Sequence, residues 1–309
     1  MAGTGCDPHI LVGYDGSPQS EQALEWGVEE ARLRQLPLTV CHAWHWPYPF
    51  RQQTDGIAKI TQEMGQVVLN SGVTAARRLG DELDVRPLLV KGLPHAAILD
   101  AGCGAELIVL GSRGNGGFEE LPVGSVAAQV PAYAVCPVIV VRPLPAGRPH
   151  PVRILVGVDG SSTSEAALGF AFQEAALRDG TVHVLCSWWD PGALPGPERA
   201  AFTDPEAVRQ EAQTRFERAI APWRANWPEV PLETDFQIES PRRALLAAAG
   251  DATLLVVGDR GLGSAPGMLL GPVAQAVLHE APCPVAVVHA PNRSRYQRGP
   301  KQCPAAEAA

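Results

Sequence analysis

Short apolar runs alternate along the chain with longer stretches whose apolar residues recur at helical spacing. In the first half, the runs predict β-strands at 9–14, 38–44, 84–90, 105–111 and 137–142. The last three are expected to be fully buried. Because strands and helices alternate, the strands should pair in parallel through right-handed crossovers, in an open sheet with helices on both faces. Ligands of such sheets bind at the carboxyl ends of the strands.

The stretches between the runs predict helices. Ser17-Pro18 is expected to begin the first helix, because proline is tolerated in an opening turn. A second helix is predicted at about 57–80. The apolar stripe of the first helix is expected to consist of Leu24, Val28, Ala31 and Leu33.

The pattern of the first half recurs in the second half. Ile10–Ser17 and Ile154–Ser161 agree at seven of eight positions, at an offset of 144 residues. Glycines later in each half align at an offset of 147, which indicates a net insertion of three residues in a loop. We therefore expect an α/β fold with two tandem open, mostly parallel five-stranded sheets of the Rossmann-like kind, covered by helices on both faces.

The distribution of proline and the loss of apolar periodicity predict the domain boundaries. The proline-rich segment 143–151 is predicted to be a linker. We expect the first domain to span residues 1–145 and the second to span 151–291. Residues 292–309 lack apolar periodicity and are expected to form a disordered tail.

Composition narrows the class of protein. A length of 309 residues fits two domains, and a content of 46% hydrophobic and 19% charged residues is typical of globular proteins. The net charge of -8 argues against partners such as nucleic acid or an anionic membrane. No apolar run reaches the roughly eighteen residues of a membrane span, and no leader peptide is recognised, so a cytoplasmic location is expected. The seven scattered cysteines include no C-x-x-C pair, so neither a disulfide framework nor a zinc site is expected.

Two segments at strand ends are candidates for a binding site. Asp15-Gly16-Ser17 places a carboxylate, a flexible glycine and a serine after the first strand, and it recurs at Asp159-Gly160-Ser161. The same residues are also what an ordinary strand-to-helix turn prefers. The loop from Gly111 to Gly117, with Gly124-Ser125 at the start of a helix, is a stronger candidate. Its glycines let backbone N–H groups face an anion, the helix start adds unpaired N–H groups, and Arg113 adds charge, so phosphate is the expected ligand. A tight turn without a ligand is the alternative.

The spacing G-x-x-G-x9-G-[S/T], together with the D-G-S turn, resembles the ATP-binding signature of universal stress proteins. The resemblance extends over both halves, at about 9–142 and 152–290. It implies an adenine nucleotide alpha hydrolase-like fold that binds ATP, with magnesium accompanying the nucleotide. It assigns Asp15 and Ala43 to the adenosine end and the loop glycines to the ribose and phosphates. The full set of residues assigned to the site is Gly13, Asp15, Ala43, Leu110, Gly111, Arg113, Gly114, Gly124, Ser125 and Val126.

The second half keeps the glycines but not every donor. Its matching site residues are Gly157, Asp159, Gly258, Gly261 and Gly271. Pro272 stands where the first half has Ser125, which removes a hydroxyl and an N–H donor. Asp259 stands where the first half has Ser112. A carboxylate about 5 Å from a phosphate would cost roughly 3 kcal/mol at an effective dielectric near 20. The second half is therefore expected to bind nucleotide weakly or not at all.

Three functions remain open on the sequence alone. The first is a regulatory ATP-binding protein with a role in the stress response. The second is an interaction module that does not need nucleotide, in which the last strands, 137–142 and 284–289, pair within one chain or in a homodimer; family resemblance supports this pairing. The third is slow ATP hydrolysis, with Asp15 positioning a metal or water. No catalytic residue is assigned, and no P-loop, G-x-G-x-x-G or G-x-S-x-G motif supports another enzyme class.

Other conspicuous residues have ordinary interpretations. His42 and His45, near Cys41, are expected to be packed or exposed rather than to bind a metal. Trp44 and Trp188 are expected to pack in the core, with stacking near a base as the alternative. Cys136 and Cys283 are expected to be buried, unreactive thiols. The loops 46–57 and 190–206 are either surface connections or lids over a nucleotide.

Overall fold

The computed structural model describes residues 7–46, 55–116, 122–143, 151–188, 205–265 and 267–290. Residues 144–150 of the predicted linker, the predicted tail and most of the two loops considered as lids lie outside these ranges.

Each half of the chain forms a five-stranded unit. The elements of the first half are β1 (His9–Gly13), α1 (Pro18–Arg34), β2 (Leu38–Trp44), α2 (Asp55–Leu79), β3 (Val85–Lys91), α3 (Pro94–Ala101), β4 (Ala105–Gly111), α4 (Ser125–Tyr133) and β5 (Val138–Val141). The elements of the second half are β6 (Arg153–Val158), α5 (Ser162–Leu177), β7 (Thr181–Ser187), α6 (Pro205–Asn226), β8 (Leu232–Gln237), α7 (Pro241–Ala248), a 3-10 turn (Ala249–Asp251), β9 (Leu254–Gly258), α8 (Pro272–Glu280) and β10 (Val285–Val288). The predicted strands and the first two helices of the first half are confirmed to within a few residues.

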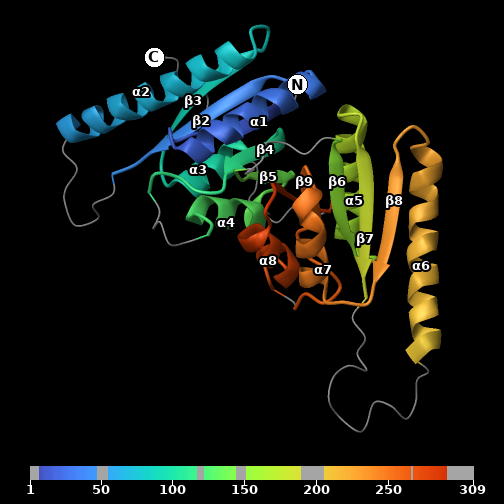
Figure 1. Cartoon of the computed structure of the whole chain (residues 1–309). Coiled ribbons are helices and arrows are strands. Elements are labelled where there is room, and N and C mark those ends of the chain that lie inside the picture. Colours follow the sequence, from blue (N-terminus) through green and yellow to red (C-terminus); the bar gives the residue numbers. More distant parts are fainter. Residues whose placement is uncertain are drawn as a thin grey trace, which may run out of the picture.

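The strands of both halves belong to one ten-stranded sheet, in the order β3-β2-β1-β4-β5-β10-β9-β6-β7-β8. Neighbours within each half are parallel, whereas β5 and β10 are antiparallel, with Ile139 opposite Ala286. The two five-stranded units therefore meet edge to edge, and their last strands satisfy each other's backbone groups. Figure 1 shows the two halves lying side by side and meeting near β5.

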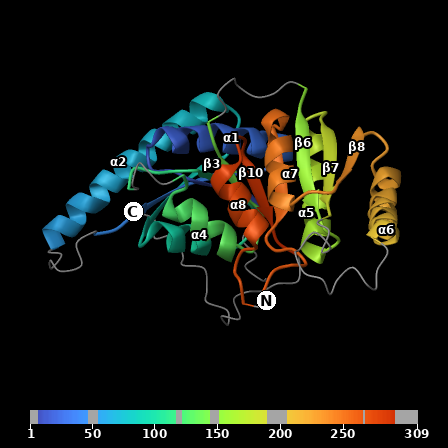
Figure 2. The same ribbon diagram turned by 60° about the horizontal axis from the view of Figure 1, so that its bottom comes forward.

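Helices cover both faces of the sheet. One face buries apolar residues from α1, α2, α5 and α6, and the other buries residues from α3, α4, α7 and α8. Figure 2 shows α1 and α2 on one side of the strands and α4 on the other. This arrangement confirms the predicted α/β fold with a mostly parallel sheet. Among the described helices, each is too short or too polar to cross a bilayer.

The prediction that the strand at 84–90 is fully buried is wrong. In β3 only Val85 is buried, and Pro87 and Lys91 are exposed. The strand lies at one edge of the sheet, where α2 and its neighbours cover only part of it. An apolar run alone does not distinguish an edge strand from a central one, and Pro87 marks an edge because it cannot donate to a neighbouring strand.

The predicted stripe of the first helix is correct at three of its four positions. Leu24, Val28 and Ala31 are buried, whereas Leu33 is only partly buried. The buried face continues instead through Trp26, because the helix packs against both the sheet and the second half of the molecule.

Two hydrogen bonds tie the halves together on the α4 and α8 face. The guanidinium of Arg142, just after β5, donates to the backbone carbonyl of Leu278 in α8. The Nε2 atom of His289, just after β10, donates to the carbonyl of Pro131 in α4 over 2.9 Å. Arg142 and His289 are equivalent in the repeat, as are Pro131 and Leu278. Each half thus supplies a side chain that donates to a backbone carbonyl in the last turn of a helix in the other half. Carbonyls in a last helical turn have no partner within their own helix.

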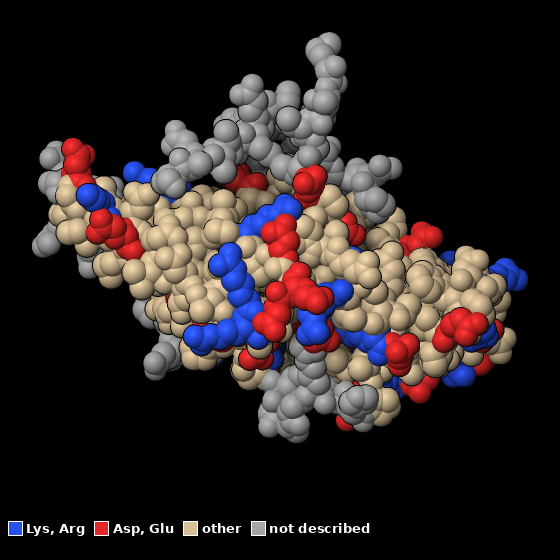
Figure 3. All heavy atoms as spheres, turned by 90° about the horizontal axis from the view of Figure 1, so that it is seen from above, with Lys and Arg blue, Asp and Glu red and all other residues tan. Residues whose placement is uncertain are grey.

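Ion pairs join the halves on the opposite face. Arg34 of α1 pairs with Glu174 of α5, and Arg178, just after α5, pairs with Glu30 of α1. On the surface view of Figure 3, basic and acidic side chains are likewise interleaved near the middle of the face rather than gathered by sign.

Candidate functional site

The site begins at the turn between β1 and α1. The two carboxylate oxygens of Asp15 each accept a backbone hydrogen bond. Oδ1 accepts from the N–H of Ser17 at 3.0 Å, and Oδ2 accepts from the N–H of Asn115 at 2.8 Å. The side-chain amide of Asn115 donates in return to the carbonyl of Asp15 at 2.8 Å. Asp15 therefore joins the turn after β1 to the glycine-rich loop after β4, 100 residues further along the chain.

The glycines of the loop are required by close contacts. A Cβ atom on Gly111 would lie 2.7 Å from the backbone carbonyl of Gln19, which cannot move aside as a flexible side chain can. A Cβ atom on Gly114 would lie 2.3 Å from Oδ2 of Asp15. The first two glycines of the motif thus allow the loop to pack against α1 and against the Asp15 carboxylate.

The helix that follows the loop has an open N-terminus. Gly124 is its N-cap, and among the described residues no side chain is seen to cap its first turn. Ser125 is exposed and does not cap the helix, because it occupies the first helical position, one residue after the N-cap. By contrast, Ser17 caps α1 by accepting from the N–H of Ser20 at 3.2 Å. The N–H of Gly124 donates to the carbonyl of Ser112 at 2.8 Å, which brings the start of α4 back to the end of β4. Unpaired N–H groups at a helix start favour an anion.

The other assigned residues of the first half lie around this loop. Gly13 and Leu110 touch inside the core, because a Cβ on Gly13 would lie 2.7 Å from Cδ2 of Leu110. Val126 is partly buried against the same core. Arg113 is partly buried, and its carbonyl accepts from the hydroxyl of Ser17 at 3.5 Å.

A second basic side chain lies near the loop. Burial lowers the pKa of the Arg142 guanidinium, Cys283 opposes this effect, and the positive charge of Arg113 lowers the pKa further. The positive charges of Arg113 and Arg142 therefore repel each other, and the guanidinium of Arg142 already donates to the carbonyl of Leu278.

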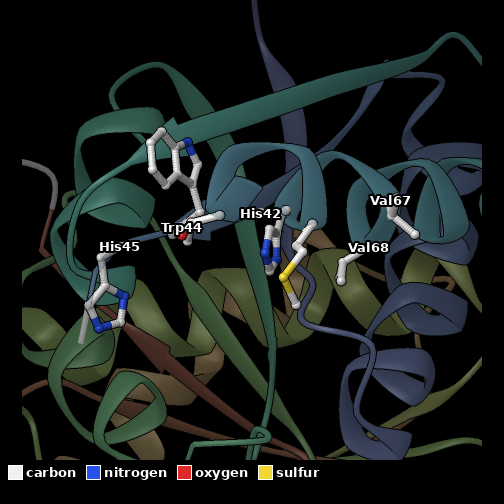
Figure 4. A pocket seen from close by; sticks show the side chains of 9 residues that line it. His42, Trp44, His45, Val67 and Val68 are labelled. Atoms are coloured by element: carbon white, nitrogen blue, oxygen red, sulfur yellow. The ribbon is translucent and has the colours of Figure 1, made fainter. Parts of the chain in front are cut away.

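A hollow of about 480 Å³ opens at the end of β2, next to α2. Figure 4 shows His42, Trp44 and His45 from the β2 end and Val67 and Val68 from α2 around it. Its walls also include Ala43, Thr61, Met64 and Gly65. The hollow adjoins the turn after β1, since a Cβ atom on Gly16 would lie 3.7 Å from Val68. Val68 and Met64 are residues that the sequence analysis missed, because no motif links a distant helix to the turn.

The histidines and tryptophan of this region have structural contacts. The Nδ1 atom of His42 donates to the carbonyl of Tyr14 at 2.8 Å. Trp44 is 8% exposed, and Nζ of Lys91 lies 5.4 Å from its ring centroid. Burial raises the pKa of the Cys41 thiol to about 12. The described residues include no group of three His, Cys, Asp or Glu side chains suited to a metal ion.

Cys136 and Cys283 are buried, as predicted. Burial raises the pKa of each thiol to about 12, so neither forms a thiolate at neutral pH.

The second half repeats the loop geometry. The carboxylate of Asp159 accepts from the N–H groups of Ser161 at 3.0 Å and Leu262 at 2.8 Å. A Cβ atom on Gly261 would lie 2.3 Å from Oδ2 of Asp159. The N–H of Gly271 donates to the carbonyl of Asp259 at 2.8 Å. The backbone hydrogen bonds to the aspartate are therefore the same in both halves, whereas Leu262 cannot repeat the side-chain bond that Asn115 makes to the carbonyl of Asp15.

The charges of the second loop differ from those of the first. Asp259 is 1% exposed, and its Oδ2 atom lies 3.5 Å from Nε of Arg260. Arg260, the counterpart of Arg113, also donates to the carbonyl of Met268 at 3.1 Å. The hydroxyl of Ser264 accepts from the N–H of Gly261 at 3.1 Å. A buried carboxylate therefore partly neutralises the basic side chain of this loop, and one loop N–H already has a partner.

The fold and the loop geometry are those of a tandem α/β protein with two corresponding loops at the carboxyl ends of its strands. The universal stress protein family matches residues 8–142 and 152–289, and the chain belongs to this family. A universal stress protein of Mycobacterium tuberculosis strain H37Rv is 36% identical over 289 residues, which cover 90% of this chain and 96% of the relative. Another, from Mycolicibacterium smegmatis, is 31% identical over 292 residues, with 90% and 96% covered.

Solved structures agree with the observed fold. The crystal structure of a universal stress protein from Archaeoglobus fulgidus superposes with a TM-score of 0.65 at 20% identity, covering 91% of this chain and 96% of that one. That likeness concerns the fold alone. A universal stress protein solved in complex with cAMP aligns with 44% of this chain at a TM-score of 0.36.

Proposed function

We propose that this chain is a regulatory ATP-binding protein of the universal stress family, which holds nucleotide mainly in its first half. The observation that carries the proposal is the start of α4, which no side chain of the described residues caps, held beside a glycine-rich loop in which every motif residue is kept. The N–H groups of the first turn of α4 and the hydroxyl of Ser125 would face a polyphosphate, and Arg113 adds a positive charge to the loop. Regulation, rather than catalysis, is favoured because the described residues of the loop include no general base paired with a nucleophile.

The adenosine end is proposed to lie at the hollow beside Ala43. Neighbouring strands are about 4.8 Å apart, so the ends of β2 and β4, with β1 between them, are roughly 10 Å apart. A nucleotide crossing the end of β1 would place its base at the hollow and its phosphates at the start of α4. Apolar walls such as Met64 and Val68 suit a planar base.

A magnesium ion is proposed to arrive with the nucleotide. Magnesium keeps several waters and is held mainly through phosphate oxygens and one or two carboxylates. Both oxygens of Asp15 already accept backbone hydrogen bonds, so this carboxylate is not expected to be a direct ligand.

The second half is proposed to be a weak site or an empty one. Asp259 places a buried negative charge at the loop and pairs with Arg260. Pro272 removes a hydroxyl and an N–H from the start of α8. Both changes disfavour phosphate while the frame of the loop is kept.

Isothermal titration with ATP tests the proposal on the full chain. We expect one site per chain, loss of binding in Gly124→Glu, and little change in the matched variant Gly271→Glu of the second half. A Cβ atom at Gly271 would lie 2.9 Å from Oγ of Ser264, whereas the nearest atom to one at Gly124 is 3.4 Å away. Crowding alone would therefore disturb Gly271→Glu at least as much as Gly124→Glu, so the pair separates loss of the site from general damage. Equal affinity in the wild type and Gly124→Glu, or no binding in either, would contradict the proposal.

The two other functions are separable by experiment. For an interaction module that does not need nucleotide, the supporting observation is the intact β5–β10 junction, which requires no ligand. Mass spectrometry of ligand released by heat from the purified protein should reveal nucleotide if the first proposal holds. For slow ATP hydrolysis, a turnover unchanged in Asp15→Ala would count against a role of Asp15 in the reaction. A homodimer of the whole chain and a cytoplasmic location remain predictions.

A further inference from the structure

The carboxylate of Asp15 is used in a way that the sequence motif does not indicate. Oδ1 accepts from the N–H of Ser17 on its own turn, and Oδ2 accepts from the N–H of Asn115 on the loop after β4. In return, the side-chain amide of Asn115 donates to the backbone carbonyl of Asp15. The loop is thereby attached at its middle to the end of β1.

Gly114 leaves the space that the carboxylate of Asp15 occupies. A Cβ atom at Gly114 would lie 2.3 Å from Oδ2 and 3.3 Å from Cγ of Asp15. By contrast, apart from its chain neighbours, no atom of the described residues lies within 4 Å of a Cβ atom placed on Gly116. The second glycine of the motif therefore makes room for the carboxylate of Asp15.

The same pairing persists in the half where the phosphate donors have changed. Asp159, Gly261 and Leu262 repeat the carboxylate, the close glycine and the donating N–H with almost the same distances. The second half has Pro272 in place of Ser125, Asp259 in place of Ser112 and Leu262 in place of Asn115. The two backbone hydrogen bonds to its aspartate are nevertheless kept. The aspartate and the glycine therefore serve the shape of the loop independently of a bound phosphate.

We propose that Asp15 is a positioning residue of the nucleotide site, which acts through the loop 111–116 rather than by contact with the base or a metal ion. Its carboxylate keeps the loop close to β1, so that the loop N–H groups and the start of α4 face the same space. The effect on nucleotide affinity rests on the proposed function, whereas the effect on loop order does not.

Asp15→Asn is the most informative variant because it is nearly isosteric. The remaining oxygen can still accept from Ser17, but an NH₂ group replaces the acceptor that faces the N–H of Asn115. Hydrogen exchange on the ligand-free full chain should then be about 10- to 100-fold faster at 112–116, because a charge-assisted hydrogen bond is lost. Gly114→Ala should have the same effect by displacing the carboxylate, and Gly116→Ala should have none.

ATP affinity is a second measurement, which a purely structural role of Asp15 would leave unchanged. Titrations of Asp15→Asn are expected to show a loss of about tenfold or more, equal in magnesium and in EDTA, at an unchanged melting temperature. The matched variant Asp159→Asn should speed exchange at 259–264 and leave ATP affinity unchanged.

Three results would overturn the proposal. Unchanged exchange at 112–116 in ligand-free Asp15→Asn would show that the carboxylate does not hold the loop. A loss of affinity seen only with magnesium would make Asp15 a metal ligand. A loss of affinity in Asp15→Asn that Gly114→Ala does not share would indicate direct contact with the nucleotide. Absence of ATP binding to the wild type contradicts the proposed function, and the exchange rates then still decide whether Asp15 orders the loop.

Discussion

Glu30 of α1 and Glu174 of α5 are equivalent residues of the two repeats, and each pairs with the arginine of its own half and with that of the other half. Arg34 lies 3.1 Å from Glu30 and also bonds Glu174, while Arg178 lies 2.5 Å from Glu30 and also bonds Glu174. Both carboxylates are fully buried. The guanidinium groups stack on the aromatic ring of the opposite helix, with Arg34 over Phe170 and Arg178 over Trp26. The cluster is therefore symmetric about the junction of the two halves.

Removing one arginine from this cluster should destabilise the protein strongly. In Arg34→Met, Glu30 and Glu174 lose a shared partner while they remain buried. Loss of one member of a buried ion pair typically costs about 3–5 kcal/mol. Urea unfolding of the full chain should show a loss in this range. The matched variant Arg215→Met breaks an exposed pair with Glu211 and should cost less than about 1 kcal/mol. Similar losses in the two variants would contradict the importance of burial.

The cluster should also make stability depend on pH. Burial and the charge of Glu30 raise the pKa of Glu174 from 4.5 to about 7, against the opposite effects of Arg178 and Arg34. Since the folded state then binds more protons than the unfolded chain between about pH 4.5 and 7, the free energy of unfolding should fall as the pH rises through this window. Glu174→Gln removes this titration.

Urea unfolding at several pH values between 5 and 8 measures the effect. Relative to Glu174→Gln, the wild type should lose about 1–3 kcal/mol as the pH rises. Glu211→Gln, in an exposed pair, serves as the control and should follow the wild type. Parallel curves for the wild type and Glu174→Gln would show that Glu174 does not take up the proton.

Substitution of Gly111 should disturb the loop and α1 together. A methyl group there would press on the backbone of Gln19, which can move only with its helix. Overpacking of this kind costs about 1–3 kcal/mol. Thermal unfolding of Gly111→Ala and of the control Gly116→Ala should separate the two positions. An equally stable Gly111→Ala would contradict the close approach of the loop to α1.

The second half should regain a nucleotide site when its donors are restored. Because Asp159, Gly261 and Gly271 keep the loop frame, Asp259→Ser combined with Pro272→Ser should be sufficient for ATP binding. The double change is best titrated in the Gly124→Glu background, where the first site is disabled. Pro272→Ser alone should fail, because the Asp259 carboxylate remains. No binding by the combined variant would show that the second loop differs in more than these two residues.

Much of the fold follows from local patterns in the sequence. The predicted strands at 38–44 and 105–111 coincide with β2 and β4. Ser17 caps the first helix, as Ser17-Pro18 predicted. These features depend on residues within a few positions of each other, through side-chain periodicity and capping, so the order of elements is readable from a single chain. The spacing of Gly111, Gly114 and Gly124 likewise located the candidate loop.

Only the tertiary structure decided how these elements meet. It joined the two units into one sheet, left β3 at an edge, buried Asp259, and brought Asp15 to Asn115 and Glu30 to Glu174. The approach of Asp15 to Asn115 and of Glu30 to Glu174 depends on which surfaces pack together across 100 residues or more of chain. The energies that select them, burial of charge and close backbone contact, act between elements rather than within a local sequence pattern.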